Sequence, residues 1–179
     1  MDEVTRDLRY PIGQFEAGAP PDRSMRLVLL AQMSEAPSLL RAAVANLSDS
    51  QLDTPYRPGG WTVRQVVHHL ADSQLNWYLR TKLAVTEDVP TIIPFDEVLW
   101  AELHDARTAP LEPSLILLDG LYRRWVDLYQ SLSEEQWKRR LIHPERGVFV
   151  LDTTLPMHVW HGQHHTAHIT ELRKRMDWK

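Results

Sequence analysis

Apolar side chains recur every three or four residues over most of this chain, which is the spacing of amphipathic helices. The pattern predicts four long helices, at residues 22–46, 62–86, 113–131 and from Thr153 or Thr154 onward. Four such helices, joined by short loops and one longer crossover, are typical of a helix bundle. We therefore predict an all-α fold, a four-helix bundle with short extra helices.

Shorter elements fill the connections between the long helices. A turn of helix is expected at 48–51, an amphipathic helix in the crossover at 95–107, and a short helix from Ser133 through Arg139. A β-prone stretch at 148–151 follows a Pro-Glu-Arg-Gly turn and predicts a small hairpin with residues 141–143.

Prolines and glycines interrupt the helical pattern in two places. Residues 1–20 carry four prolines or glycines in their second half alone, and Pro21 follows directly, so we predict an irregular N-terminal arm at 1–20. Within the first long helix, Pro37 is expected to kink or divide it. The whole chain of 179 residues is within the ordinary size of one domain, which we place at 1–179.

Composition narrows the classes of function. The net charge is −4 with acidic and basic residues interspersed, which gives no indication of binding to nucleic acid or to a membrane. The chain has no cysteine, which excludes disulfides, thiolate metal ligands and a cysteine nucleophile. The N-terminus lacks an apolar signal core, and no stretch approaches about 18 uninterrupted apolar residues, so we expect a cytoplasmic protein acting on a small molecule.

Histidines are concentrated near the C-terminus. Five of the nine lie in one short run, at His158, His161, His164, His165 and His168. On a helix, His161 and His165 are separated by one turn and about 40°, so both imidazoles can reach one ion. Neutral imidazole is a common ligand of zinc, nickel, copper and iron, and this spacing therefore suggests a metal site.

The remaining histidines of the run have less definite roles. His158 and His168 extend the same helical stripe and are candidates for a fourth ligand, whereas His164 falls to one side. The alternative is that these are surface histidines or core histidines held by hydrogen bonds. Two ligands on one helix do not complete a site, so a third must come from elsewhere in the chain.

A second histidine-bearing helix is predicted after Gly59-Gly60. Thr62 and Gln65 form a capping box that starts it. Beside its apolar flank runs a polar stripe, made of His69, Ser73, Asn76 and Arg80. Such a stripe is typical of a cavity lining, although for Asn76 and Arg80 a solvated face is an equal alternative. His68 points about 100° away from His69, so the two cannot easily share an ion.

Several motifs together resemble a known family. They are the segment from Gly59 to Ser73, the Trp-His-x-x-His-His-x-x-His-Ile run from Trp160, the Tyr-Pro-Ile-Gly at 10–13, the segment at 49–57 and the terminal Met-Asp-Trp at 176–178. The chain is similar to the YfiT branch of the DinB superfamily, and the resemblance covers nearly its whole length. These proteins are four-helix bundles, commonly homodimers, with a divalent metal on three histidines.

The resemblance implies which histidines are ligands. One family ligand precedes a leucine on the second helix, which corresponds to His69, and two form H-x-x-x-H on the last helix, which corresponds to His161 and His165. The chain departs from the broader family after the last ligand, where Thr166-Ala167-His168 replaces Arg-Gly-Gln or a similar sequence. This departure affects the expected contacts around the ligands. The implied ion is zinc, with nickel as the alternative.

Two kinds of chemistry fit three neutral histidines. Such a site leaves a position open on the ion, which can lower the pKa of a bound water to about 7 or deprotonate a bound thiol. In H-E-x-x-H proteases a glutamate is the general base, but here Gly162, Gln163 and His164 lie between the ligands. The missing carboxylate favours thiol activation over hydrolysis.

The resemblance leaves both activities open. The branch is commonly described as metal-dependent hydrolases, while relatives are associated with S-transfer from bacillithiol or similar small thiols. In the second case Arg80 is a candidate anchor for a carboxylate of the thiol. A third hypothesis is a non-catalytic metal-binding or stress-response module that sequesters the ion. An enclosed fourth ligand would favour sequestration, and an open pocket lined by Ser73, Asn76 and Arg80 would favour an enzyme.

Overall fold

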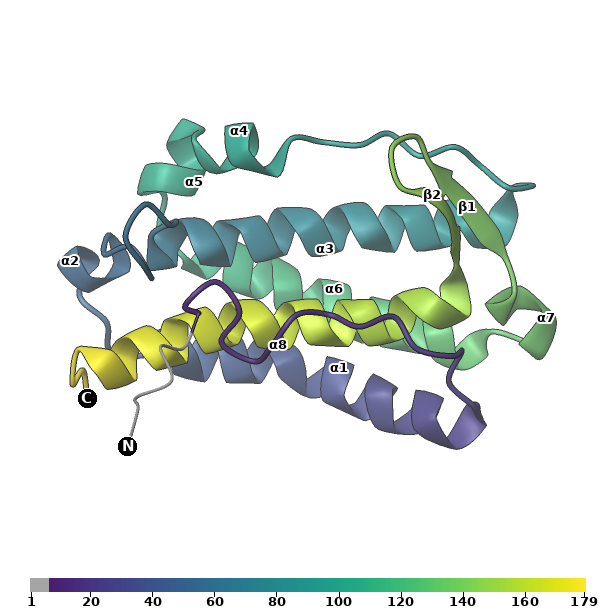
Figure 1. The fold of residues 1–179 in the computed structure, drawn as a ribbon, viewed down its shortest axis with the longest axis horizontal. Coiled ribbons are helices and arrows are strands. Elements are labelled where there is room, and N and C mark those ends of the chain that lie inside the picture. Colours follow the sequence, from purple (N-terminus) through teal and green to yellow (C-terminus); the bar gives the residue numbers. More distant parts are fainter. Residues whose placement is uncertain (1–6) are drawn as a thin grey trace.

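The computed structural model describes residues 7–179 and is a four-helix bundle (Figure 1). The long helices are α1 (Arg23–Val44), α3 (Val63–Thr86), α6 (Glu112–Ser131) and α8 (Leu151–Arg175). The predicted all-α class and bundle architecture are therefore confirmed. The apolar faces of the four helices meet in one core, in which Met33, Val66, Trp125 and Leu155 have no exposed surface.

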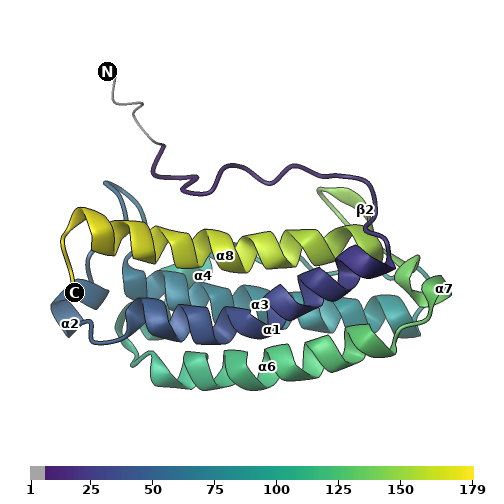
Figure 2. The same cartoon turned by 90° about the horizontal axis from the view of Figure 1, so that it is seen from below.

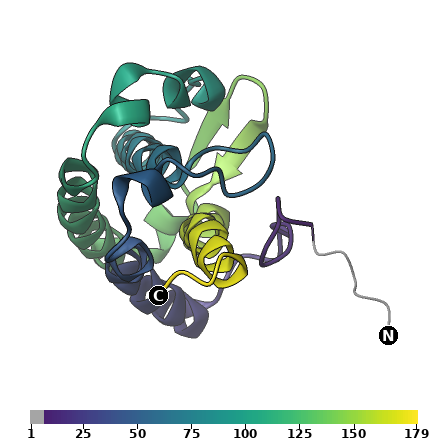
Figure 3. The same cartoon turned by 90° about the vertical axis from the view of Figure 1, so that its left-hand side faces the viewer.

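The order of the helices around the bundle differs from a simple up-and-down arrangement. Viewed along the axis, α1, α6, α3 and α8 follow one another, and each packs against its two neighbours (Figure 3). Helices α1 and α8 run in one direction, and α3 and α6 run in the other (Figure 1). The segment between α3 and α6 therefore returns along the length of α3, and it covers the outer side of this helix.

Capping boxes set the start of three helices, as their sequences predict. At the start of α3, the Thr62 hydroxyl accepts from the Gln65 amide, and the Gln65 side chain accepts from the Thr62 N–H at 2.9 Å. The same reciprocal bonds begin α2 (Asp49–Leu52) and α7 (Glu134–Trp137). Each box satisfies two backbone donors that a helix start leaves without partners, so these starts are defined locally.

The predicted hairpin is also present. Strand β1 (Arg140–His143) pairs antiparallel with β2 (Gly147–Val150), and Gly147 adopts a positive φ of 80° at the turn. The hairpin lies beside the C-terminal half of α3, where α8 begins (Figure 1). This position brings the hairpin to one end of the space between α3 and α8.

The crossover contains two short helices rather than the single helix predicted at 95–107. Asp96 caps α4 (Glu97–Ala101) by accepting from the amides of Val98 and Leu99. The chain then adopts an extended backbone at Leu103 before α5 (His104–Thr108). Because Leu103 is extended, the helical hydrogen bonds cannot continue across it, and the apolar spacing of the segment is shared by two separate turns.

Two predicted helix limits are not found. Pro37 is expected to kink or divide the first helix, and division is wrong, because the helix continues from Arg23 to Val44 and packs against both α6 and α8. The last helix begins at Leu151, not at Thr153 or Thr154. The two threonine hydroxyls donate back to the carbonyls of Val150 and Leu151 instead of capping the helix, since the chain enters α8 directly from β2.

The N-terminal arm is irregular where the structure describes it. Residues 7–21 form no helix or strand, and they run along α8 (Figures 1 and 2). His168 shares a hydrogen bond of 3.0 Å with the Arg9 carbonyl through Nε2, and the ring of Phe15 lies against Trp160. The described part of the arm thus packs over its own bundle, while residues 1–6 of the predicted arm lie outside the described residues.

Among residues 7–179, α1 is the one helix that is long and apolar enough to cross a membrane, judged by length and composition alone. A core helix of a soluble protein passes the same test. Here α1 packs against α6 and α8 as a bundle helix, although several of its apolar side chains remain exposed.

Candidate metal centre

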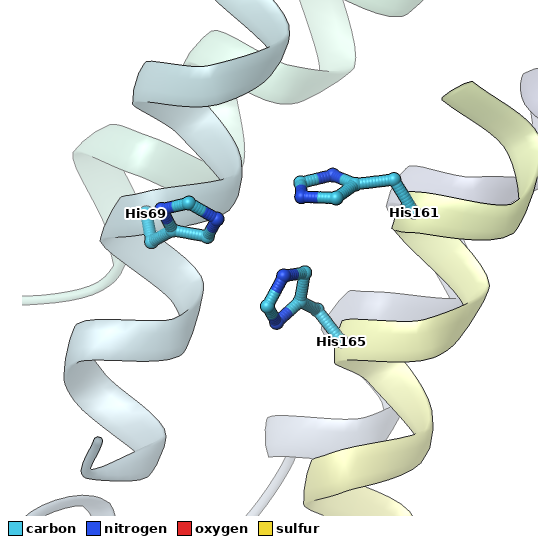
Figure 4. A group of neighbouring side chains, drawn as sticks. All are labelled: His69, His161 and His165. Atoms are coloured by element: carbon cyan, nitrogen blue, oxygen red, sulfur yellow. The ribbon is translucent and has the colours of Figure 1, made fainter. Parts of the chain in front are cut away.

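Three histidines from two facing helices meet between α3 and α8. His69 comes from α3, while His161 and His165 come from successive turns of α8, as their i, i+4 spacing predicts. One ring nitrogen of each lies within 4.8 Å of those of the other two. Figure 4 shows the three rings turned toward one another across the space between the helices.

The protonation state of this cluster suits a metal ion. Burial lowers the pKa of His69 to about 4. The pKa values of His161 and His165 are lowered well below the ordinary value, first by burial and then by the neighbouring histidines. All three imidazoles are therefore neutral near pH 7, which is the form that binds a metal. Three neutral nitrogen donors are a ligand set that zinc and nickel both accept.

A buried glutamine, Gln74, lies beside the cluster, and the sequence does not predict it. Gln74 has no exposed surface, and its Nε2 lies 3.1 Å from Nδ1 of His161, while its Oε1 has no hydrogen-bond partner. With the amide turned over, Oε1 accepts a hydrogen bond from the Nδ1–H of His161, and Nε2 of this histidine is free for a metal. Gln74 is five residues after His69 and lies off the polar stripe, so only the packing of α8 reveals it.

The cluster lies in the wall of a cavity of about 840 Å³. Helices α3 and α8 form much of its lining, and the arm, the crossover and the hairpin add further residues. Of the predicted pocket residues, Ser73 and Arg80 line this cavity. Asn76 does not belong to the lining, because its amide donates to the Asp72 carbonyl one turn back on the same helix.

The two candidates for a fourth ligand lie beside the cluster but turn their rings to other partners. His158 packs between the rings of Trp77 and Trp125, where burial lowers its pKa to about 3. His168 stacks on Tyr56 and is bonded to the arm at Arg9. Neither histidine joins the group of ligand atoms found among residues 7–179.

The two histidines adjacent to the ligands are also accounted for. Both ring nitrogens of His68 have partners outside the cavity, the Ser114 hydroxyl at 2.8 Å and the Ala109 carbonyl at 3.2 Å. His164 stacks on Trp160 on the side of α8 that faces the arm. Their positions agree with the divergence predicted from helical geometry.

Three tryptophans lie around the cavity. Trp61 lies with its ring centroid 4.6 Å from that of His69, and Trp77 and Trp160 line the same cavity. Trp125 is a buried core residue, whereas Trp100 is 39% exposed on the crossover. The cavity therefore combines aromatic walls with charged side chains of the crossover, the hairpin and α3.

Carboxylates lie away from the histidine nitrogens. Within residues 7–179, the group of close ligand atoms contains imidazoles alone. The acidic residues that line the cavity are Asp96 and Glu97 of the crossover and Glu145 of the hairpin turn. Among the described residues, no carboxylate therefore takes the place of the glutamate that H-E-x-x-H enzymes use as a base.

Helical bundles hold metal ions with side chains from facing helices. Three neutral histidines on two facing helices, at the wall of a cavity, place this protein in that structural class. Within that class, the family profile of the DinB superfamily matches residues 32–169, and the chain belongs to this superfamily.

Two relatives and one solved structure are similar to this protein along nearly its whole chain. A protein of Bacillus cereus strain B4264, named "Putative metal-dependent hydrolase", is 50% identical over 172 residues, covering 96% of this chain and 99% of the relative. A protein of the same name from Bacillus thuringiensis subsp. konkukian is 49% identical with equal coverage. The solved structure of YfiT from Bacillus subtilis, described as a probable metal-dependent hydrolase with an unusual four-helix bundle topology, superposes with a TM-score of 0.94 at 47% identity. It covers 96% of this chain and 99% of YfiT.

Proposed function

We propose that this protein is a metal-dependent enzyme in which His69, His161 and His165 hold a divalent ion that activates a small thiol for S-transfer. The observation that carries the proposal is the meeting of three neutral histidines at the wall of a cavity of about 840 Å³. The ion we propose is zinc, with nickel as the alternative, because nitrogen-only ligation suits both. We also propose that the enzyme acts in the cytoplasm.

The chain's own residues prepare the cavity for such chemistry. A divalent ion on three imidazoles retains its charge and stabilises the thiolate form of a thiol that binds it. Trp61, Trp77 and Trp160 line this position and offer aromatic surface to the apolar part of a bound thiol. Gln74 orients the ring of His161, and the Ser73 hydroxyl is available to a substrate in the cavity.

Hydrolysis is the second candidate, favoured by the names of the relatives. In H-E-x-x-H enzymes a carboxylate close to the ion assists hydrolysis by removing a proton from the attacking water. The acidic residues of the cavity lie on the crossover and the hairpin, outside the group of close ligand atoms. Thiol activation does not need this base, because the ion itself favours the thiolate.

Simple sequestration of the ion is less well supported. A storage or structural site is usually closed by a fourth protein ligand. In the described part of the chain, His158 and His168 stay outside the ligand group, and the histidines border a cavity with room for a small molecule. This arrangement favours turnover over sequestration.

Conjugation of a thiol to monochlorobimane tests the proposal. We expect the zinc-loaded protein to accelerate the reaction of at least one thiol from a panel that includes bacillithiol, and His161→Ala to lose the acceleration. A hydrolase would instead cleave amides or esters without a thiol, with a rate that rises through the pKa of metal-bound water. Metal-dependent amide cleavage with no conjugation across the panel would overturn the S-transfer proposal.

A further inference from the structure

Arg80 is a buried cation that lacks an acidic partner. It is 6% exposed, and its one hydrogen bond among the described residues is from NH2 to the carbonyl of Ile93, at 2.9 Å. Within residues 7–179, no carboxylate lies at ion-pair distance from its guanidinium, whereas the other buried arginines, Arg26 and Arg64, each pair with two acids. A buried charge without an ionic partner destabilises a folded protein. The burial of Arg80 therefore suggests that a ligand supplies the missing negative charge.

The surroundings of Arg80 favour an anion. The guanidinium carbon lies 5.0 Å from the ring centroid of Trp77 and 5.9 Å from that of Phe95. Desolvation lowers its pKa, and the charge of Arg146 lowers it further. The three acids of the cavity lining, Asp96, Glu97 and Glu145, form no ion pair with Arg80 among the described residues; Asp96 instead caps α4, and Glu145 is exposed on the hairpin turn. A negative group of a ligand would relieve this positive potential.

Arg80 is placed to act on the same molecule as the metal centre. On α3, His69 and Arg80 share one side of the helix, with Ser73 between them, and all three line one cavity. The guanidinium lies over Trp77, three residues before Arg80, as helical side chains that point toward the N-terminus do. His69 and Trp77 are eight residues apart, so the guanidinium lies about 12 Å along the helix from the metal ligand.

We propose that the ligand of this cavity carries an anionic group, a carboxylate, which binds the guanidinium of Arg80 while its other end reaches the metal centre. A carboxylate is the planar partner that guanidinium binds through two parallel hydrogen bonds. This inference rests on the proposed function for the reactive end of the ligand. It adds the substrate class: small, extended anions with about 12 Å between the charged group and the activated atom.

Two hydroxamates of equal length test this subsite without requiring a thiol or turnover. Suberic acid monohydroxamate has a zinc-binding group at one end and a carboxylate at the other, and its terminal primary amide is the uncharged match. We expect calorimetric titration of the zinc-loaded protein to show about 30-fold tighter binding of the carboxylate, the value of a good charge-assisted hydrogen-bonded pair. Succinic acid monohydroxamate, which is too short to reach Arg80, should show no preference over its amide.

Variants distinguish the effect of Arg80 from a general effect of positive charge in the cavity. Arg80→Gln should reduce the preference to about threefold or less, and Arg80→Lys should keep an intermediate preference, because lysine retains the charge without the bidentate geometry. Arg146→Gln removes an exposed cation from the same cavity lining and should reduce the preference much less than Arg80→Gln, because solvent and salt screen an exposed charge. Zinc content and circular dichroism verify that each variant is folded and loaded.

Three results would overturn the subsite: equal binding of the acid and the amide to the unaltered protein, binding of neither, or the same loss in Arg146→Gln as in Arg80→Gln. A structural role for Arg80, through Ile93 and Trp77, predicts lower stability in Arg80→Gln with the preference retained. If thiol conjugation fails but the carboxylate preference depends on Arg80, the S-transfer proposal is wrong and the anion subsite remains.

Discussion

The nine histidines of the chain have different surroundings, and these separate possible metal ligands from structural residues. His68 has both ring nitrogens occupied, and His168 is bonded to the arm. His69, His161 and His165 instead turn nitrogens toward one another (Figure 4). All of these residues are histidines, so their different roles follow from the residues that pack around each ring.

Replacement of any one of these three histidines by alanine should abolish stoichiometric metal binding, because two imidazoles do not retain an ion against dialysis. Elemental analysis of purified His69→Ala, His161→Ala and His165→Ala measures the loss. His68→Ala and His164→Ala are matched controls on the same helices and should keep a full equivalent of metal. A full equivalent in His69→Ala would refute the ligand assignment.

Gln74 should contribute to metal affinity through His161. If its Oε1 accepts from Nδ1–H of His161, Gln74→Leu removes this bond and should weaken zinc binding about 10- to 100-fold, as loss of an outer hydrogen-bond partner does. Competition with a chromophoric chelator measures the change.

Gln74→Glu distinguishes the two orientations of the amide. Glutamate can accept but not donate when ionised, so it should restore most of the affinity if Gln74 accepts from His161. If Gln74 instead donates to His161 through Nε2, the glutamate variant should bind zinc as weakly as Gln74→Leu.

At the scale of elements, α8 combines structural and chemical roles. One side of it packs against α1, and another meets α3 and carries His158, His161 and His165. Polar rings in a buried position are costly unless they stay neutral or find partners. The pKa of His158, lowered to about 3 by burial between tryptophans, shows this cost directly.

His158 should make the metal-free protein sensitive to acid. Its pKa is about 3 in the folded state and near 6.5 when unfolded, so below pH 6.5 the unfolded chain binds a proton that the folded chain does not. The free energy of unfolding therefore decreases as the pH is lowered below 6.5. His158 alone contributes a decrease of about 1.4 kcal/mol per pH unit. In His158→Phe this contribution disappears, and urea unfolding at pH 7.5 and pH 5 should show a smaller loss.

An exposed histidine provides the control for this measurement. His104 lies exposed on α5, so His104→Gln removes a histidine without disturbing the buried core and serves as the reference for the two unfolding measurements. Equal losses on acidification in His158→Phe and the unaltered protein would contradict the assignment of a neutral buried His158.

At the scale of the whole molecule, the surface of the bundle remains apolar in places. Leu27 and Leu39 of α1 are 59% and 52% exposed. Leu39 also lines a groove between α1 and α8, together with Ala36, Gly162 and Trp178. Exposed apolar surface of this kind is a common site of protein association.

The resemblance to the YfiT branch implies a homodimer, and we propose that its interface covers this groove. Light scattering should give twice the chain mass of 20.8 kDa at micromolar concentration. Leu39→Glu places a charge in the groove and should shift the protein toward monomers, while zinc binding is retained. Leu79→Glu, on an exposed leucine of α3, is the matched control and should remain dimeric. A monomer mass for the unaltered protein would refute the dimer.

The sequence by itself determined the features that depend on short spacing. Helical periodicity and capping boxes predict the bundle helices and the start of α3 at Thr62, and the i, i+4 spacing brings His161 and His165 together. Contacts between helices depend on how the helices pack, and a repeat within one helix does not encode this. The tertiary structure alone therefore decided that Gln74 contacts His161, that Asn76 lies outside the cavity, and that Arg80 is a buried cation within it.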